Sequence, residues 1–468
     1  MLCQSKGFKL KIFHKFVRNI SSPVIARKDG LPDLFQHLKE LRATENWSSE
    51  KIRELQFIRL KELLQHAYEN TIFYRKRFDE VGLAPHKLQD PEEIRKIPIL
   101  TKEDIRENLD SMLAKCCKAG QLHSSETGGT TGVKMKFYRD NSSLSLKEAA
   151  LYRFENWAGW DFGERIGIIW PATADYVGHW SWKAKIKNEL FCRQIVLPAA
   201  ALDEEIIGDY VALLTKKRPA IIRGFSTPVF EVANYIYGKG IEVPLKGVIT
   251  TGEPLFPKQR QIIEKAFQCK AYDSYRTREA GPVAQQCIEL HGLHVNAECL
   301  YVEVEAMPGL EDGTGEIIIT DLVNYGMPLI RYSIGDLGKL SSKPCPCGRG
   351  LPMIENICGR TADVFFAPNG KRVMPGSLVL YLVDQAPGLL GQVQIIQDGL
   401  DHIIIRMTPD PMPSQEIKDY QMKKVKELFG PEMKVSFEIV DSIPRGPSGK
   451  YPFTICQINK DQKIPQIK

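Results

Sequence analysis

The residues with the most evident chemistry form a loop of hydroxyl-bearing side chains and glycines at residues 124–134, SSETGGTTGVK. Its three glycines allow tight turns that present backbone N–H groups to an anion, and the hydroxyl groups add further donors. The residue order of a Walker loop is missing. Taken alone, the loop predicts a phosphate site no more strongly than an ordinary flexible connection.

Five segments further along the chain also carry groups suited to a nucleotide. A carboxylate can accept hydrogen bonds from ribose hydroxyls, and a lysine can neutralise phosphate charge. In chain order the segments are residues 250–254, 273–279, 328–336, 359–363 and 444–450. Each one taken singly is explained equally well by turn residues, a surface ion pair or a solvated lysine.

Alternating strands and helices are predicted to position these segments. From residue 50 to about residue 81, apolar side chains recur at three- and four-residue steps without Gly or Pro, which predicts helix. Beyond Pro98, short apolar runs at residues 166–170, 195–197, 220–222 and 247–250 alternate with helical stretches at 204–215 and 258–267. This alternation predicts parallel strands covered by helices, and ligands bind at the carboxyl ends of such strands.

The last part of the chain is predicted to be antiparallel and to end in a small separate unit. Apolar runs at residues 300–305, 315–320 and 329–332 lie around Pro-Gly and Asp-Gly turns. After Gly359, strands at residues 393–397, 402–407 and 434–439 accompany a helix at 415–428. The expected fold class is α/β: a large N-terminal α/β domain with parallel sheets and a β-rich end, then a small α+β domain. We expect a basic arm at 1–46, an N-terminal domain at 47–358 and a C-terminal domain at 359–468.

Composition narrows the classes of function. The 468 residues are 43% hydrophobic, which excludes wholesale disorder, and no apolar run is long enough to span a membrane. Residues 1–28 carry seven Lys and Arg and no acid, so the net charge of +6 leaves the remaining chain near neutral. A neutral body argues against a nucleic-acid-binding enzyme. Eleven scattered cysteines without a recognisable signal peptide favour a reduced, cytoplasmic setting.

The basic arm has two interpretations. Phe8, Ile12, Phe16 and Ile20 recur at four-residue steps with basic residues on the other side, as in a helix that lies on the inner face of a membrane. Lys9 interrupts the apolar face, so the alternative is a helix or tail packed on the body, or a poorly ordered extension. The sequence leaves the oligomeric state open, with a homodimer as one option.

Together and in this order, the six motifs resemble those of the adenylate-forming enzymes, the superfamily of acyl-CoA synthetases, peptide-synthetase adenylation domains and luciferases. The closer resemblance is to the phenylacetate–coenzyme A ligase branch and its relatives in capsular-polysaccharide gene clusters. It runs from about Trp47 to the end of the chain and includes the segments at residues 63–71 and 73–75, LLQHAYENT and FYR.

The resemblance implies an enzyme that joins a carboxylic acid to the α-phosphate of ATP, releases pyrophosphate and passes the acyl group to coenzyme A. Glu279 would help hold Mg²⁺, Asp336 would bind the ribose, and Tyr275 would stack near the adenine. Lys450 would bridge the acyl carboxylate and the α-phosphate, and the small domain would rotate about a hinge at Asp363. The expected catalytic residues are Lys450, Glu279 and Thr130. The expected nucleotide-binding residues are Thr127, Gly128, Gly129, Thr131, Gly132, Lys134, Gly252, Glu253, Asp273, Tyr275, Asp336 and Arg360.

The chain departs from the usual pattern of these enzymes in three places. Thr127-Gly128-Gly129 stands where many members have Thr-Ser-Gly, while Arg276 and Arg278 replace a glycine and a threonine. An arginine before the glutamate resembles the capsule-cluster relatives, which leaves the acyl acid and its acceptor open. One alternative is amide or ester formation on an amine, a sugar or a carrier protein. The other is a non-catalytic relative that binds nucleotide.

Cysteines form a second group of chemical interest. Cys345 and Cys347 lie in a turn-rich loop, and Cys287 lies upstream with His291 or His294. Four thiolates and imidazoles suit tetrahedral Zn²⁺, and buried free thiols are the alternative. Some members of the resembling ligase branch carry structural zinc in the corresponding region. On that likeness we expect zinc ligands at Cys287, His291, Cys345 and Cys347.

Two segments are candidates for an acyl pocket. Residues 170–182 are rich in aromatic side chains, which could line a pocket or pack in a core. Residues 225–227, Phe-Ser-Thr, directly follow a predicted strand and are therefore the better candidate.

Overall fold

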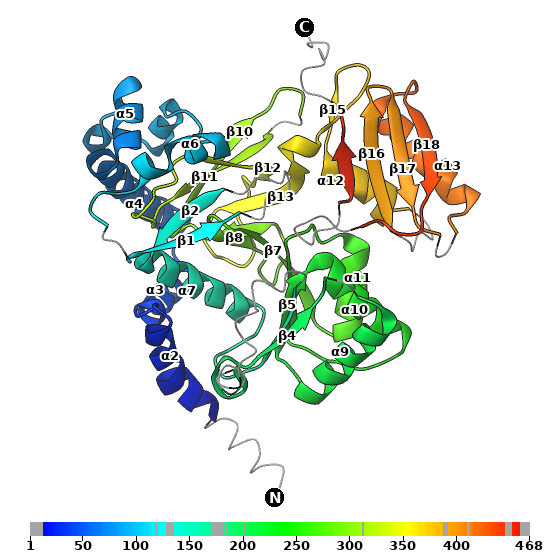
Figure 1. The fold of residues 1–468 in the computed structure, drawn as a ribbon, viewed down its shortest axis with the longest axis horizontal. Helices are drawn as coiled ribbons and strands as arrows, with labels where there is room; N and C mark the ends of the chain where they lie inside the picture. Colours follow the sequence, from blue (N-terminus) through cyan, green and yellow to red (C-terminus); the bar gives the residue numbers. More distant parts are fainter. Residues whose placement is uncertain are drawn as a thin grey trace, which may run out of the picture.

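The computed structural model describes residues 13–117, 120–127, 135–170, 182, 186, 188–200, 202–310, 313–386, 392–409, 412–444 and 452–458 (Figure 1). Its first elements are helical: η1 (Val17–Ser21), α2 (Ser22–Lys28), α3 (Leu34–Thr44), α4 (Ser49–Asn70), α5 (Ile72–Glu80) and α6 (Lys102–Met112). The Ser48 hydroxyl caps α4 by accepting the Lys51 N–H, and Thr71 caps α5 by accepting the Tyr74 N–H. The two caps explain why the predicted helix from 50 to 81 is divided at Thr71.

Eleven strands of the described chain form one mixed sheet, in the order β10-β11-β12-β13-β9-β8-β7-β6-β5-β3-β4. Its parallel half comprises β3 (Ile166–Trp170), β4 (Gln194–Pro198), β5 (Ile221–Phe225), β6 (Gly247–Thr251) and β7 (Lys270–Thr277). Its antiparallel half comprises β8 (Gly281–Gln285), β9 (Leu293–Val295), β10 (Leu300–Ala306), β11 (Thr314–Asp321), β12 (Tyr332–Leu340) and β13 (Met353–Arg360). The predicted change from parallel to antiparallel strands is confirmed, and it occurs after β7, earlier in the chain than the apolar runs from residue 300 onward indicated.

Helices cover both faces of the parallel half. On one face, α9 (Glu204–Lys217), α10 (Ser226–Gly238) and α11 (Pro257–Phe267) pack on side chains such as Ile169 and Val248. On the other face, α7 (Asn141–Trp157) packs on their strand neighbours, Ile168 and Ile249. Successive side chains of a strand point to opposite faces, so strands covered on both sides are apolar throughout. This is why the parallel strands were readable as apolar runs.

A second, smaller sheet follows in the C-terminal part of the chain. Its strand order is β18-β17-β16-β19, formed by β16 (Val393–Gly399), β17 (His402–Met407), β18 (Lys434–Ile439) and β19 (Thr454–Cys456), with α12 (Pro375–Val379) and α13 (Gln415–Phe429) beside it. This unit lies next to α11 (Figure 1). There the Lys258 N–H donates to the Asp384 carboxylate at 2.9 Å. The expected class of a large α/β part followed by a small α+β part is therefore confirmed.

One predicted strand is wrong. Residues 329–332 were expected to form a strand, but β12 begins only at Tyr332. Arg331 has a φ of +52°, in the left-handed region that ends a regular strand. Its buried guanidinium donates to the carbonyls of Arg95 and Ile97 and lies near Glu303, so it clamps the entry to β12.

The described part of the basic arm packs on the body. Val17 is buried, and the Arg18 guanidinium lies 3.6 Å from the Asp161 carboxylate. The first residues of the predicted amphipathic ladder, Phe8 and Ile12, lie outside the described residues. No helix in the described ranges combines the length and the apolar character needed to cross a bilayer.

Candidate active site

Three predicted residues meet at the carboxyl end of β7. The Tyr275 hydroxyl donates to Asp336 on β12 at 2.7 Å, and the Arg360 guanidinium at the end of β13 lies 3.5 Å from the same carboxylate. Burial, and then Asp336, raises the pKa of Tyr275 well above its usual value, so the phenol stays neutral and keeps its proton for this bond. The arrangement holds an aromatic ring and a carboxylate side by side, as a nucleoside site requires.

Glu279 lies in the loop between β7 and β8, close to this group. Its carboxylate is 7% exposed and accepts the Tyr332 hydroxyl at 3.0 Å. The charges of Glu279 and Asp336 both act on Tyr275 and Tyr332, which places all four residues in one neighbourhood. A buried carboxylate of this kind can ligate a hard cation beside phosphate oxygens.

The glycine loop leaves from a hairpin next to Glu279. The hairpin consists of β1 (Leu122–Glu126) and β2 (Lys136–Asp140), and Arg278 donates to the Glu126 carbonyl at 3.4 Å. Thr127 closes the base of the loop, since its N–H donates to the Met135 carbonyl and its hydroxyl accepts the Met135 N–H. The other predicted loop residues lie outside the described residues: Gly128, Gly129, Thr130, Thr131, Gly132 and Lys134. The same holds for Lys450.

Gly252 and Glu253 follow β6 at the same edge of the sheet. Gly252 has a φ of +79°, and a Cβ at this position would lie 2.9 Å from the Phe225 ring, so only glycine fits. Glu253 turns toward α10, where its carboxylate accepts the Thr227 N–H at 3.0 Å and its carbonyl accepts the Ser226 hydroxyl. Glu253 therefore caps α10, a role that the sequence did not suggest.

Asp273 lies in β7, two residues before Tyr275. Burial raises its pKa to about 6, against the opposing charge of Arg260 on α11. Its N–H donates to the Gln286 side chain at 2.9 Å. The carboxyl of Asp273 is thus held in the layer between the sheet and α11.

The two pocket candidates meet in part. The Trp170 ring at the end of β3 packs edge-on against Phe225 at the end of β5, with ring centroids 4.7 Å apart. Residues 171–180 lie outside the described residues. The contact between the Trp170 and Phe225 rings fits either role, so it remains a prediction whether residues 170–182 line a pocket or pack in a core.

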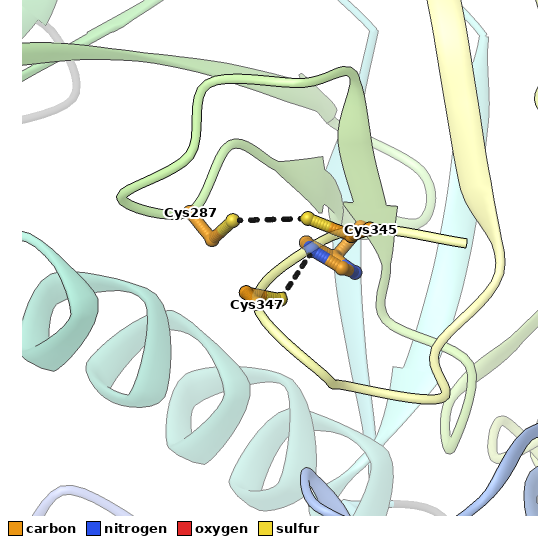
Figure 2. A group of neighbouring side chains, drawn as sticks. Cys287, Cys345 and Cys347 are labelled. Atoms are coloured by element: carbon orange, nitrogen blue, oxygen red, sulfur yellow. Dashed lines mark hydrogen bonds between the residues drawn. The ribbon is translucent and has the colours of Figure 1, made fainter. Parts of the chain in front are cut away.

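Cys287, Cys345 and Cys347 form a separate cluster together with His294. Their ligand atoms all lie within 4.8 Å of one another. Figure 2 shows the sulfur atoms of Cys287 and Cys345 facing each other, at 3.5 Å, and Cys347 Sγ lies 3.3 Å from His294 Nε2. Two thiolates bound to one tetrahedral zinc by bonds of ~2.3 Å lie about 3.8 Å apart, so the spacing fits a zinc centre. Burial, and then Arg349, lowers the pKa of His294 to about 4, which keeps the imidazole neutral.

The prediction of His291 as the fourth ligand is wrong. His291 is exposed in the turn before β9, whereas His294 is buried in β9. β9 pairs with β13 through His294 and Met353, and this pairing brings the histidine to the cysteine loop. Because the contact depends on strands distant in the sequence, residue spacing alone could not choose between the two histidines.

Sequence reasoning also missed Tyr332, which binds Glu279. Tyr332 lies in the motif at 328–336, four residues before Asp336. Side chains an even number of residues apart lie on the same face of a strand, so this spacing could have predicted that Tyr332 accompanies Asp336. Gly335, with a φ of +84°, interrupts that alternation and weakens the signal.

Comparison with known proteins confirms the resemblance. Residues 365–457 match the model of the CapK C-terminal domain. Protein CapK of Staphylococcus aureus is 27% identical over 459 residues, which cover 96% of this chain and 97% of that protein. Phenylacetate-coenzyme A ligase of Aromatoleum evansii is 27% identical, covering 80% of this chain and 85% of the ligase, and the Escherichia coli ligase is 26% identical, covering 72% and 78%.

Solved structures confirm the fold. The 2-hydroxyisobutyryl-CoA ligase in its postadenylation state superposes with a TM-score of 0.70 at 21% identity, covering 88% of this chain and 90% of that one. The same ligase with coenzyme A in the thioesterification state gives 0.57 at 22% identity, covering 89% and 92%. The chain therefore has the fold of the adenylate-forming ligases, and CapK and phenylacetate-CoA ligases are among its homologues.

Proposed function

We propose that this chain, a homologue of CapK and of phenylacetate-CoA ligases, is an ATP-dependent, AMP-forming acid–coenzyme A ligase. It activates a carboxylic acid as its acyl-adenylate with release of pyrophosphate, and then forms the thioester with coenzyme A. The observation that carries the proposal is the convergence of Tyr275, Asp336 and Glu279 at the carboxyl end of β7. The relatives that match most of the chain include several phenylacetate-CoA ligases, which supports the same activity.

In this proposal the nucleotide lies along the edge formed by β6, β7 and β12. Asp336 accepts the ribose hydroxyls while Tyr275 holds the carboxylate in place and offers its ring to the adenine. Arg360 balances the charge of Asp336. Gly252, Glu253 and Asp273 would form the neighbouring wall of the base site.

Two sets of groups would neutralise the negative charge of the phosphates. Glu279 would ligate Mg²⁺, which supplies neutralisation of the charge that builds on phosphate oxygens in the transition state. Residues 127–134, which include the expected catalytic residue Thr130, would offer backbone N–H groups and hydroxyls to the β- and γ-phosphates. Thr127 would keep the loop closed through its two bonds to Met135.

The C-terminal unit would supply the last charge. Lys450 would bridge the acyl carboxylate and the α-phosphate, a point charge where negative charge converges. Asp363 lies in η7 (Thr361–Asp363), between the last strand of the large sheet and the first strand of the small unit. A rotation about Asp363 would exchange Lys450 for a surface that admits coenzyme A.

We further propose that Cys287, His294, Cys345 and Cys347 hold a structural zinc ion. The fit rests on four donors of the right type with ligand atoms within 4.8 Å of one another. Four protein ligands leave no open position, so the ion would join the loop at 345–347 to β9 and would take no part in the reaction.

The basic arm is proposed to touch the inner face of a membrane. Phe16, Ile20 and Val24 are 45%, 55% and 47% exposed and recur at four-residue steps on one side of the helical segment. Seven basic residues and no acid precede Asp29, so the segment that carries this apolar stripe has a positive charge that anionic lipids complement.

The acceptor distinguishes the main proposal from its rival. The likeness to CapK over nearly the whole chain favours, as a second candidate, transfer to an acceptor in capsular polysaccharide synthesis. The test is pyrophosphate release from ATP over a panel of carboxylic acids, each with and without coenzyme A. Release with thioester formation supports the ligase, release that ignores coenzyme A supports another acceptor, and no release with any acid contradicts adenylation altogether.

A further inference from the structure

A layer of buried polar groups lies between α7 and the carboxyl ends of β5, β6 and β7. Arg223 of β5 forms an ion pair with Glu155 of α7, which shows that this face of the sheet looks toward α7. In the parallel register, Arg223 lies opposite Ile249, and two residues further Phe225 lies opposite Thr251. The next row on this face therefore begins with Phe225 and Thr251.

The row continues across two more strands. Thr251 lies opposite Ser274 of β7, and Ser274 lies opposite Gln285 of β8. Gln285 donates to the carbonyl of Phe154 in α7 at 2.8 Å, which confirms the direction of the row. Arg276 belongs to the same face because its Nε donates to the Ser274 hydroxyl at 3.0 Å.

Charges in this layer balance. Burial raises the pKa of Glu148 on α7, while Arg223 and Arg276 oppose that shift, so both guanidinium groups act on this carboxyl. Glu155 experiences the same two arginines. Two carboxylates and two guanidinium groups carry no net formal charge. A charged group brought into the layer would therefore find no excess of the opposite sign.

Several polar atoms of the layer are buried without a partner among the described residues. Thr251 is 2% exposed and its Oγ1 makes no hydrogen bond there, and the same holds for Gln285 Oε1. Ser145, three residues before Glu148 on α7, also has a buried Oγ that makes no hydrogen bond to the described residues. Buried polar groups of a fold are normally hydrogen-bonded, so several unpaired ones in one layer point to a bound molecule that supplies the bonds.

The layer adjoins the proposed nucleotide site. Thr251 directly precedes Gly252, and Ser274 and Arg276 flank Tyr275 in the sequence, with their side chains on the side of β7 that faces α7. We propose, resting on the proposed ligase activity, that the acyl acid carries a neutral hydrogen-bonding group, a hydroxyl, which Thr251 binds within this layer. A hydrocarbon acid would leave the buried hydroxyls unpaired, and a charged substituent would disturb a balanced set of charges.

The experiment compares matched acids in pyrophosphate release: lactate with propionate, β-hydroxybutyrate with butyrate, and mandelate with phenylacetate. For at least one pair, kcat/KM for the hydroxy acid is expected to exceed that for its partner at least tenfold. Thr251→Val keeps the shape and removes the hydroxyl, so it should lower this ratio about five- to tenfold. Ser145→Ala is a second variant should Thr251→Val fold poorly, as judged by thermal unfolding.

The matched control is Thr215→Val, which removes a hydroxyl bonded to the Val211 carbonyl on α9, on the far side of the sheet. It should leave the ratio unchanged. Equal or faster release with the hydrocarbon acids, a preference for charged substituents, or a ratio that neither variant alters would overturn the inference and leave the ligase proposal intact. No release with any acid would overturn both.

Discussion

The Tyr275 hydroxyl donates to Asp336 at 2.7 Å, and this bond joins the last parallel strand of the sheet to a strand four positions away in the antiparallel half. It aligns an aromatic ring with a carboxylate at the point where the strand direction changes. Ligands of α/β proteins bind outside the carboxyl ends of parallel strands, so the bond lies where a nucleotide is expected.

Asp336→Ala should weaken ATP binding by removing the acceptor of the ribose hydroxyls. Hydrogen bonds to charged groups are worth about 1.5–3 kcal/mol, so the KM for ATP should rise at least tenfold in pyrophosphate release. Tyr275→Phe keeps the ring and loses only the bond to Asp336, and it should have a smaller effect. An unchanged KM for ATP in Asp336→Ala would remove Asp336 from the nucleotide site.

Lys450→Ala should abolish most of the adenylation without unfolding the protein. Removal of one group that stabilises charge in a transition state typically costs about a hundred- to a thousandfold in kcat. Lys423→Ala, which changes an exposed lysine of α13, is the control and should keep wild-type release. Near wild-type pyrophosphate release by Lys450→Ala would contradict its proposed role.

Much of the fold was predictable because its physical causes are local. Strands buried on both faces read as apolar runs, and β3, β17 and β18 have the predicted bounds. The beginning of β12 was not predictable, because it depends on the left-handed backbone of Arg331 and on carbonyls more than 200 residues away. Long-range contacts of this kind leave no periodic signal in the sequence.

The candidate site was predictable in its residues more than in their contacts. The motifs identified Tyr275, Asp336 and Glu279, and the structure brings them together. They gave no sign that Glu253 caps α10 or that Tyr332 binds Glu279, since both contacts depend on how separate strands align. For the same reason the motifs could not indicate that His294, and not His291, lies beside the cysteines.

His294→Ala should remove zinc, whereas His291→Ala should keep it. The two histidines are three residues apart, but only His294 lies with the cysteines. Loss of a structural metal removes folding energy, so His294→Ala should also lower the midpoint of thermal unfolding by at least about 5 °C. Metal analysis of the purified variants decides the matter, and wild-type protein without zinc would end the proposal.

The basic arm should bind vesicles that contain phosphatidylglycerol and ignore vesicles of phosphatidylcholine alone. The double variant Phe16→Ser, Ile20→Ser should reduce sedimentation with the anionic vesicles several-fold, because it removes most of the exposed apolar stripe. Ile58→Ser, at an exposed isoleucine of α4, is the matched control and should bind as the wild type does. Equal sedimentation of all three proteins would contradict the membrane contact.

Asp273 should make the protein less stable as the pH rises toward neutrality. Burial raises the pKa of its carboxyl from 3.8 to about 6, so the folded state favours the protonated form. A raised pKa in an acid contributes stability that is fully present below the unfolded value, and this contribution is lost as the pH rises through the folded value. Between pH 3.8 and about 6 the loss approaches about 1.4 kcal/mol per pH unit. The side chain of the Asp273→Asn variant cannot ionise, so the variant should not lose this stability. Denaturant titration at several pH values measures the unfolding free energy of both proteins. The difference between them should shift in favour of the variant as the pH rises across this window. A difference that stays constant with pH would show that Asp273 is not held in a raised-pKa environment.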